Sequence, residues 1–397
     1  MEKYSHSTQR RTAILAIVAA TALSLVACGS NPGGNVTSDA AGRQSSISEL
    51  PTKLAEYTRA PLFKDPGPAF DAMSAAKDKS LFLIPASSEV PFVQNIGSGI
   101  KALGSQVGLK VTDWKNQGKT AQHTEGMTNA IAQKTSSIDL LAGLDPATVG
   151  PQIAQAKAAG IDTIASHLYD PAQAPLPALA ATVDAPYQRA GELLADYAIN
   201  KTQGKLNALV VTINEVNSTK PMVNGIKQEI GKYCADTCKL SYINSSISQL
   251  ATQVPSDVRG ALQRDPKINY IIALYDSAQV PFVISGIESS GSTNPPKIIT
   301  YNGTPSMLKL VAEGKIEMDI GENLTWISLA VLDQHLRLFA GLPPVKDPNI
   351  PLRIWDATNI AEAGSPPMDS KGFGDEYLTA YAKLWKLPTD MKLGSAG

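Results

Sequence analysis

Short apolar runs alternate with amphipathic segments through most of the chain, and the whole alternation occurs twice. The first series runs from SLFLIPA at residues 80–86 to IDTIAS at 161–166, and the second from LNALVVTI at 206–213 to KIITY at 297–301. Buried strands that alternate with helix-length segments are the pattern of βαβ units, whose strands form parallel sheets. The sequence therefore predicts an α/β protein with two Rossmann-like lobes.

The two series also share short matching stretches. Residues 89–101 read EVPFVQNIGSGIK and residues 215–227 read EVNSTKPMVNGIK, so both begin with Glu-Val and end with Gly-Ile-Lys. Each stretch follows the first strand of its series and reaches into the next helix. We expect the Ile of Gly-Ile-Lys to face the sheet and the Gly to allow close approach of a neighbouring element. The repeat indicates two lobes of the same topology.

After the second series the chain returns between the lobes. A long helical segment is followed by a strand, LRIWDAT, and a last helix, EYLTAYAKLWKL. We expect a hinge of about three strands near Val183-Asp184, Gly321-Asn323 and Pro351-Ile354. The N-terminal lobe then comprises residues 79–183 and about 323–348, and the C-terminal lobe residues 184–322 and about 349–390. Ligands of open α/β sheets bind beyond the carboxyl ends of the strands, so the facing lobes would share one cleft.

The N-terminus has the pattern of an exported lipoprotein. A basic stretch, MEKYSHSTQRR, precedes an apolar run of 16 residues, and Cys28 follows at once. This run is shorter than the roughly 20 residues of a membrane span and suits a signal peptide. The sequence LVAC at residues 25–28 resembles the lipobox of bacterial lipoproteins, in which the cysteine carries lipid such as palmitate. We expect a signal peptide at 1–27, a lipidated Cys28 on the extracytoplasmic face of the cell membrane, and a flexible tether and strap at 28–78.

Charge and cysteine content narrow the function classes. The formal net charge is −1, so the chain has no basic excess that would attract nucleic acid. The two cysteines after Cys28 are Cys234 and Cys238, and in an exported protein such a pair most readily forms a small disulfide. A metal site is the alternative, although zinc prefers four ligands and the nearest histidine is His167. We expect no metal and no cofactor.

Several short motifs occur along the chain in an order that is typical of one protein family. They are Pro91-Phe92 after the first strand, Asp184-x6-Gly191 at the first crossing, Tyr275-Asp276, the run from Tyr301 to Pro305, and AGLPP near the end. In this order they resemble the substrate-binding lipoproteins of ABC importers, in the ribose- and galactose-binding class of type I periplasmic binding proteins. The resemblance covers roughly residues 79–360. It implies a monomer that captures a small hydrophilic solute, usually a sugar or polyol, and delivers it to a membrane permease by hinge closure.

The resemblance also implies ligand contacts, position by position. Phe92 is similar to the aromatic residue that packs on a sugar face. Four further residues stand where the family often has polar ligand contacts: His167, Tyr275, Asn302 and Glu322. The two arginines that grip pentoses have no counterpart, because Leu168 and about Met222 occupy their places. This departure argues against ribose itself and leaves another polyol or a less sugar-like ligand.

Each of four acidic residues has two alternative roles. Asp145 and Asp276 both open a helix after a strand, and they either contact the ligand or cap the helix, as Pro146 after Asp145 suggests. Glu89 and Glu215 lie in the loops just after their strands, at the lips of the cleft. In the resembling family such residues meet arginines of the permease, and the alternative is a solvated loop charge.

Other function classes fit the sequence less well. Ser166, His167 and Asp170 suggest a catalytic triad, but adjacent strand residues point in opposite directions, and the chain contains neither G-x-S-x-G nor H-E-x-x-H. A sugar-responsive repressor would need a helix-turn-helix where the signal peptide stands. A lipoprotein that senses its ligand for a signalling system stays open beside import. We therefore predict a binding protein and not an enzyme.

Overall fold

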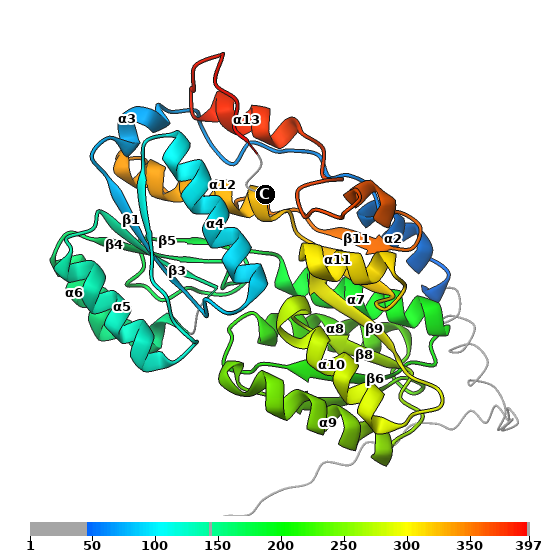
Figure 1. Ribbon diagram of the computed structural model, residues 1–397. Coiled ribbons are helices and arrows are strands. Elements are labelled where there is room, and N and C mark those ends of the chain that lie inside the picture. The colour runs from blue at the N-terminus through cyan, green and yellow to red at the C-terminus, as the bar shows by residue number, and fades with distance from the viewer. Residues whose placement is uncertain (1–45, 143–144, 395–397) are drawn as a thin grey trace, which may run out of the picture. The chain divides into compact units, whose positions relative to one another are not determined.

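A computed structural model describes residues 46–142 and 145–394 and contains two α/β lobes (Figure 1). The predicted signal peptide, Cys28 and most of the tether lie outside the described residues. Two lobes of similar topology confirm the predicted fold class. None of the helices in the described part of the chain combines the length and apolar character that a membrane span needs.

The N-terminal lobe contains a parallel five-stranded sheet in the order β2-β1-β3-β4-β5. Its strands are β1 (Ser80–Pro85), β2 (Lys110–Asp113), β3 (Ser137–Leu141), β4 (Asp162–Ser166) and β5 (Ala181–Val183). Its helices are α3 (Ala72–Ala76), α4 (Pro91–Gln106), α5 (Thr120–Ala132), η1 (Pro146–Val149), α6 (Gly150–Ala158) and α12 (Leu324–Phe339).

The C-terminal lobe contains a six-stranded sheet in the order β11-β10-β9-β8-β6-β7. Its strands are β6 (Asn207–Thr212), β7 (Lys239–Asn244), β8 (Tyr270–Ala273), β9 (Lys297–Asn302), β10 (Met318–Gly321) and β11 (Arg353–Asp356). Its helices are α7 (Tyr187–Thr202), α8 (Thr219–Tyr233), η2 (Ile247–Gln249), α9 (Leu250–Arg264), α10 (Asp276–Ser290), α11 (Pro305–Ala312) and η3 (Ile360–Ala363). β11 is antiparallel to β10, because the chain comes back from the N-terminal lobe and enters the sheet from the opposite end.

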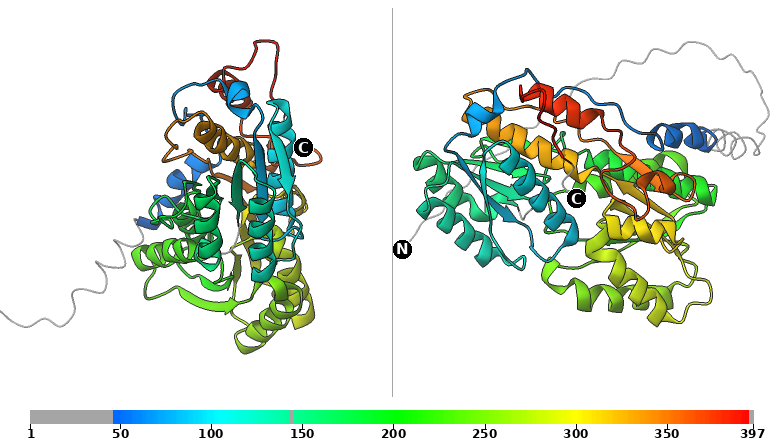
Figure 2. Two further views of the ribbon diagram at one scale, coloured as in Figure 1. Left: turned by 90° about the vertical axis from the view of Figure 1, so that its left-hand side faces the viewer. Right: turned by 45° about the horizontal axis from the view of Figure 1, so that its top comes forward.

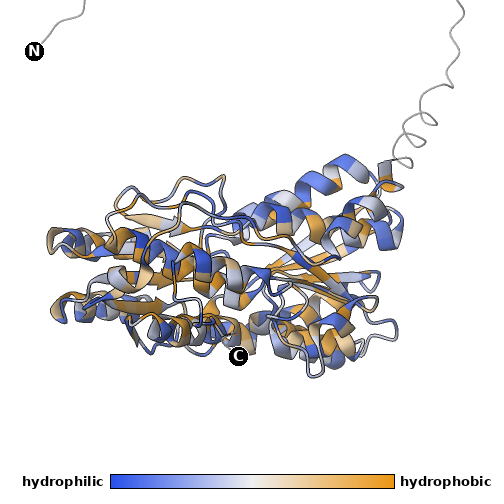
Figure 3. Ribbon diagram, turned by 90° about the horizontal axis from the view of Figure 1, so that it is seen from above, coloured by the Kyte–Doolittle hydropathy of each residue, from blue (hydrophilic) through white to orange (hydrophobic). Residues whose placement is uncertain are grey.

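Alternate residues of each central strand enter different cores, as the pleat of a strand requires. In β1, Leu81 and Leu83 pack with α4 and α12, whereas Phe82 and Ile84 pack with α5 and α6. β6 is divided in the same way between α7 with α8 and α9 with α10. The strands are largely apolar and the helices carry both kinds of residue (Figure 3). Each sheet is therefore buried on both faces, which explains why the strands read as continuous apolar runs.

Helices α7 and α8 lie unusually close together. A Cβ atom on Gly191 would lie 2.0 Å from the carbonyl oxygen of Met222, and one on Gly225 would lie 2.2 Å from that of Gln188. Only glycine fits at such a backbone contact. Gly225 is the glycine of the second Gly-Ile-Lys, so in that copy the expected close approach is present.

The disulfide lies at the end of α8. Cys234 and Cys238 are bonded, and both are buried beside the core of the C-terminal lobe. Cys234 is the C-cap residue of α8, so the bond ties the end of this helix to the start of β7.

The segment before β1 joins both lobes. Helix α2 (Leu50–Tyr57) buries Leu50 and Leu54 in the core of the C-terminal lobe, whereas Phe70 packs in the core of the N-terminal lobe. Figures 1 and 2 show this strap running from α2 near β11 to α3 near α12. It is a pass between the lobes in addition to the expected three.

The last helix, α13 (Glu376–Leu384), makes another additional pass. Tyr377 and Tyr381 belong to the core of the N-terminal lobe, and the indole nitrogen of Trp385 donates to Asp333 on α12 at 2.8 Å. Residues up to about 390 were expected in the C-terminal lobe, but α13 packs on the N-terminal lobe. The amphipathic pattern of a helix predicts that one face is buried, and it does not say against which lobe.

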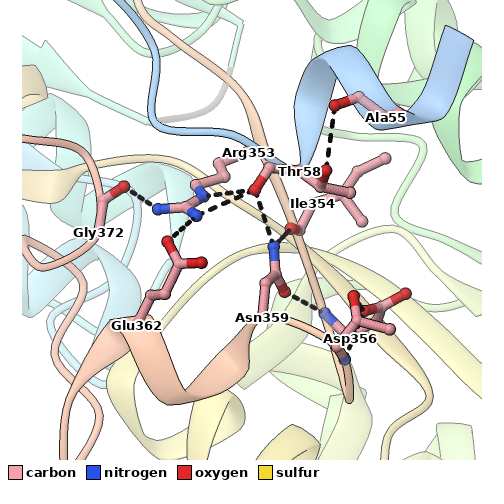
Figure 4. Close-up of polar contacts among 9 residues, drawn as sticks. Ala55, Thr58, Arg353, Ile354, Asp356, Asn359, Glu362 and Gly372 are labelled. Atoms are coloured by element: carbon pink, nitrogen blue, oxygen red, sulfur yellow. Dashed lines mark hydrogen bonds and ion pairs between the residues drawn. The ribbon is translucent and has the colours of Figure 1, made fainter. Parts of the chain in front are cut away.

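Polar contacts fix the strap to the C-terminal lobe (Figure 4). The carbonyl oxygen of Thr58 accepts hydrogen bonds from Arg353 at 2.9 Å and from Asn359 at 3.0 Å. Arg353 also donates to Gly372 and pairs with Glu362. The carbonyl group of Thr58 in the strap thus accepts hydrogen bonds from two side chains around β11.

Lys53 of α2 forms a second attachment to the C-terminal lobe. Its ammonium group lies 2.6 Å from Asp196 on α7 and 3.0 Å from Glu229 on α8. Burial and the neighbouring Glu229 raise the pKa of Asp196 to about 7. The ammonium group of Lys53 therefore offsets the repulsion between the carboxyl groups of Asp196 and Glu229.

Candidate functional site

One pocket lies between the lobes, where the strands of both sheets end. Residues that follow or end six strands line it: Ala86 after β1, Ala142 after β3, His167 after β4, Ile213 after β6, Tyr275 after β8 and Asn302 in β9. The carboxyl ends of parallel strands are the usual binding edge of α/β sheets. The remaining lining comes from loops and helix starts: Val90, Phe92, Val93, Val216, Ser218, Ile247, Leu250, Ser277 and Ala278.

Phe92 is placed in the pocket by the first turn of α4. Pro91 occupies the first helical position, where its missing N–H is harmless, so the helix begins directly at the pocket. The ring of Phe92 is 5% exposed, and its centroid lies 5.0 Å from that of His167. Phe92 and His167 were both predicted to contact the ligand, and both lie at the pocket wall. Contact with a ligand itself stays a prediction.

His167 joins the pocket to the hinge. Its backbone has φ +52°, which turns the residue away from the line of β4. Its Nε2 atom lies 2.7 Å from Glu322, and its Nδ1 atom lies 2.8 Å from the hydroxyl of Tyr187. Burial and the negative charge of Glu322 raise the pKa of Tyr187 well above its usual range, so this hydroxyl stays protonated. The imidazole therefore links three passes of the chain, near residues 167, 187 and 322.

Glu322 was predicted to contact the ligand, and the structure gives it a different neighbour. The residue is fully buried, and it is not among the residues that line the pocket. Its carboxylate holds His167 instead. Glu322 stands where the resembling family often has a glutamine. That resemblance did not predict that His167, which follows β4, would bind the carboxylate.

Tyr275 lines the pocket just before α10. Its hydroxyl lies 2.8 Å from both Ser218 and Thr219, and Thr219 in turn donates to the carbonyl oxygen of Ile213. Burial raises the pKa of Tyr275 to about 12. The hydroxyl is thus neutral, and it is occupied by hydrogen bonds within the C-terminal lobe.

Asn302 ends β9 with an unusual backbone. Its φ is +132°, and the following Gly303 lies against Gly321, where a Cβ atom would come within 2.4 Å of the backbone. The side chain of Asn302 is 3% exposed, and its amide nitrogen has no hydrogen-bond partner among the described residues. A buried donor without a partner is costly, and a ligand that supplies an acceptor would remove this cost.

The two predicted aspartates act within their lobes. Asp145 is the N-cap of η1 and accepts from the backbone nitrogen of Ala147 at 2.9 Å. Asp276 is fully buried and accepts from the backbone nitrogen and the hydroxyl of Thr304. Burial raises the pKa of Asp276 to about 6. Neither residue lines the pocket. Asp145 caps its helix, whereas the N-cap of α10 is Tyr275 and the carboxyl group of Asp276 binds Thr304 instead.

The lobes touch beside the pocket. The backbone nitrogen of Phe92 donates to the hydroxyl of Ser277 at 3.3 Å, and the side chain of Gln173 donates to the carbonyl oxygen of Asn217 at 3.5 Å. The cavity between the lobes has a volume of about 60 Å³.

The two predicted lip residues are exposed. Glu89 lies in the turn between β1 and α4. Glu215 lies between β6 and α8, and its carboxylate accepts from the backbone nitrogen of Ile247. Their contact with a permease stays a prediction. Among the described residues, no group of three or more histidine, cysteine or acidic side chains could hold a metal ion.

Sequence reasoning missed the apolar part of the lining. Ile213 and Val216 come from the loop after β6, Ile247 begins η2 and Leu250 begins α9. Ile213 directly follows its strand, a position that could have been recognised by analogy with Ala86 in the first lobe. Ile247 and Leu250 follow an edge strand with a polar sequence, and nothing local marks them as pocket residues.

Comparison with known proteins agrees with this geometry. Residues 81–341 match a family described as periplasmic binding protein domain. No curated protein matches the chain.

Solved structures share the fold at low sequence identity. A solute-binding protein of an ABC transporter from Agrobacterium vitis, solved with allitol, is 16% identical over 72% of this chain and 97% of its own, with a TM-score of 0.64. A 5-methylthioribose transporter solute-binding protein from Thermotoga lettingae is 14% identical over 78% and 98%, with a TM-score of 0.65. A protein from Mycobacterium smegmatis in complex with β-D-fucofuranose is 16% identical over 78% and 98%, with a TM-score of 0.61.

The matched family is one of binding proteins, which confirms the predicted class and the prediction that the chain is not an enzyme. The matched segment covers more than half of the 397 residues and includes every strand from β1 to β10. The chain therefore belongs to the periplasmic binding protein domain family.

Proposed function

We propose that this protein captures a small solute, a sugar or polyol, between its lobes outside the cytoplasm and delivers it to the permease of an ABC transporter. The observation that carries the proposal is the pocket at the strand ends to which both lobes contribute. A ligand that contacts both lobes favours the closed arrangement, so binding and closure are coupled. The allitol and fucofuranose complexes of similar fold support the ligand class.

The proposal includes an anchor and a docking surface. Lipid on Cys28 would hold the protein at the membrane, where the permease lies, and each buried methylene of the acyl chains contributes about 0.8 kcal/mol. Glu89 and Glu215 stand on different lobes, so a permease that contacts both would recognise the closed form. We propose this role for them on the strength of their exposure beside the pocket.

Variants in the pocket test the proposal. A thermal-shift screen of sugars and polyols should give a ligand that stabilises the protein, by about 2.7 kcal/mol at 100 times its Kd. With that ligand, Asn302→Ala should lose about tenfold or more in affinity by titration calorimetry, because a hydrogen bond to a buried amide is lost. Phe92→Ala should lose affinity as well, because apolar contact is removed from the other lobe.

The matched control is Asn129→Ala on α5, whose amide donates within its own helix. This variant should bind as the unaltered protein does. If Phe92→Ala and Asn302→Ala both fold and bind with unchanged affinity, the pocket between the lobes is not the binding site.

A further inference from the structure

The wall of the pocket is mainly hydrocarbon. Ten of the fifteen lining residues are Ala, Val, Ile, Leu or Phe, and five are polar: His167, Ser218, Tyr275, Ser277 and Asn302. Among the described residues of this lining there is no Asp, Glu, Lys or Arg. The C-terminal lobe contributes Ile213, Val216, Ile247 and Leu250, and the N-terminal lobe contributes Phe92 and Val93. Both sides of the cleft therefore present apolar surface.

Most of the polar lining groups already have partners within the protein. His167 uses both ring nitrogens, one with Glu322 and one with Tyr187. The hydroxyl groups of Tyr275 and Ser218 bond each other, and Ser277 accepts from the backbone of Phe92. A ligand that bonded these groups would have to compete with contacts that hold the lobes and the hinge.

Asn302 is the exception among the five. Its amide nitrogen is buried and has no partner within the described residues, while the side chain lies in the pocket wall. Its N–H groups can donate to an acceptor on the ligand, such as a hydroxyl or ether oxygen. The pocket thus offers one strong polar anchor and an extended apolar surround.

Such a wall discriminates against a ligand with hydroxyl groups on every side. Each hydroxyl group loses its hydrogen bonds to water on entering the pocket, and the loss is recovered only where a free protein group replaces water. A methyl, methylthio or ring CH₂ group gains contact instead.

Resting on the proposed function, we propose that the ligand is an amphipathic small solute, such as a deoxy or alkyl-substituted sugar. It carries an oxygen acceptor that meets Asn302. Its hydrocarbon portion faces Phe92 and the Ile213, Val216, Ile247 and Leu250 wall.

Matched pairs of probes test this ligand class. D-fucose differs from D-galactose by a methyl in place of a hydroxymethyl group, and 5-methylthioribose differs from D-ribose by a methylthio in place of a hydroxyl group. Cyclohexanol and myo-inositol form a pair that contains no sugar. Titration calorimetry on the full mature protein should give at least about tenfold tighter binding for the apolar member of a pair that binds.

Two variants assign the preference to the wall. Val216→Thr keeps the shape and adds a hydroxyl, and it should lower the ratio of affinities within a binding pair by about threefold or more, because the surround becomes polar. Val111→Thr on the edge strand β2 lies outside the pocket lining and should leave the ratio unchanged. Asn302→Ala should weaken both members alike, because both lose the same anchor.

Each outcome decides between the two proposals. Equal or tighter binding of D-galactose, D-ribose or myo-inositol overturns the amphipathic ligand and leaves a sugar or polyol importer standing. Binding of cyclohexanol alone keeps the amphipathic ligand and overturns the sugar assignment. No binding by any of the six probes overturns both. A ratio that Val216→Thr and Val111→Thr change equally overturns the amphipathic ligand alone, because the preference would then not come from the pocket wall.

Discussion

Asp184 is a buried carboxyl group at the first crossing between the lobes. It is 8% exposed, one of its oxygens has no hydrogen-bond partner in the described structure, and Asp170 and Asp347 lie near enough to add negative charge. Burial, with these two charges, raises the pKa of Asp184 from 3.8 to about 6. Its ionisation at neutral pH therefore opposes folding.

The pH dependence that follows can be measured. Between about pH 4 and 6 the folded state holds a proton on Asp184 that the unfolded chain has released, so the free energy of unfolding falls as pH rises through this window. Asp184→Asn removes the charge and should raise the free energy of unfolding at pH 7 by about 1–3 kcal/mol, with little change near pH 4. Urea unfolding at both pH values checks this.

The exposed Asp390 gives the control for Asp184. Asp390→Asn should change the free energy of unfolding little at either pH, because a solvated carboxylate pays no burial cost. A gain for Asp184→Asn that is the same at pH 4 and pH 7 would contradict the assignment to ionisation.

At the scale of elements, the contact between α7 and α8 depends on two glycines. In Gly225→Ala the new methyl group would meet the backbone of Gln188, which cannot move as a flexible side chain could. We expect the free energy of unfolding to fall by about 3 kcal/mol, as for an overpacked core. Chemical denaturation followed by circular dichroism measures it.

Helix α8 supplies its own control. Gly231 is exposed on the same helix, and a Cβ atom there would meet nothing within 4 Å. Gly231→Ala should leave stability unchanged or raise it by up to about 1 kcal/mol, because alanine favours helix. Equal effects of the two substitutions would mean that helix propensity, and not the close contact, determines both.

The strap helix α2 is held by charge as well as by apolar contacts. Lys53→Met would leave Asp196 and Glu229 without the ammonium group that binds them both. We expect a loss of about 1–3 kcal/mol in the free energy of unfolding, greater at pH 8 than at pH 5, because Asp196 can take up a proton at the lower pH. Urea titrations at the two pH values test it, with the exposed Lys64→Met on the same strap as the unaffected control.

The elements also show what the sequence could and could not predict. The alternation of apolar runs and amphipathic segments predicted the strands of both lobes, because parallel strands buried on two faces leave a strong local pattern. The lobe that α13 joins was not predictable in this way, and the same holds for the place of Ile247 and Leu250 in the pocket wall. Their places depend on contacts between segments that are distant in sequence.

For the whole molecule, the proposed anchor makes a simple prediction. Cys28→Ser should move the protein from the membrane fraction to the soluble fraction of cells, because the acyl chains would no longer attach. Fractionation and immunoblotting measure the distribution. A conservative change in the same tether, such as Ser30→Thr, should leave the protein with the membranes, and an unaltered distribution for Cys28→Ser would exclude the lipid anchor.

The position of α2 decides which lobe a membrane anchor would restrain. Ile47, Leu50 and Leu54 are packed in the core of the C-terminal lobe, and everything upstream of them is attached to the protein through that lobe. With lipid on Cys28, the flexible tether would reach the protein at the C-terminal lobe. The N-terminal lobe would then be linked to the bilayer only through the C-terminal lobe and the segments that join the two lobes.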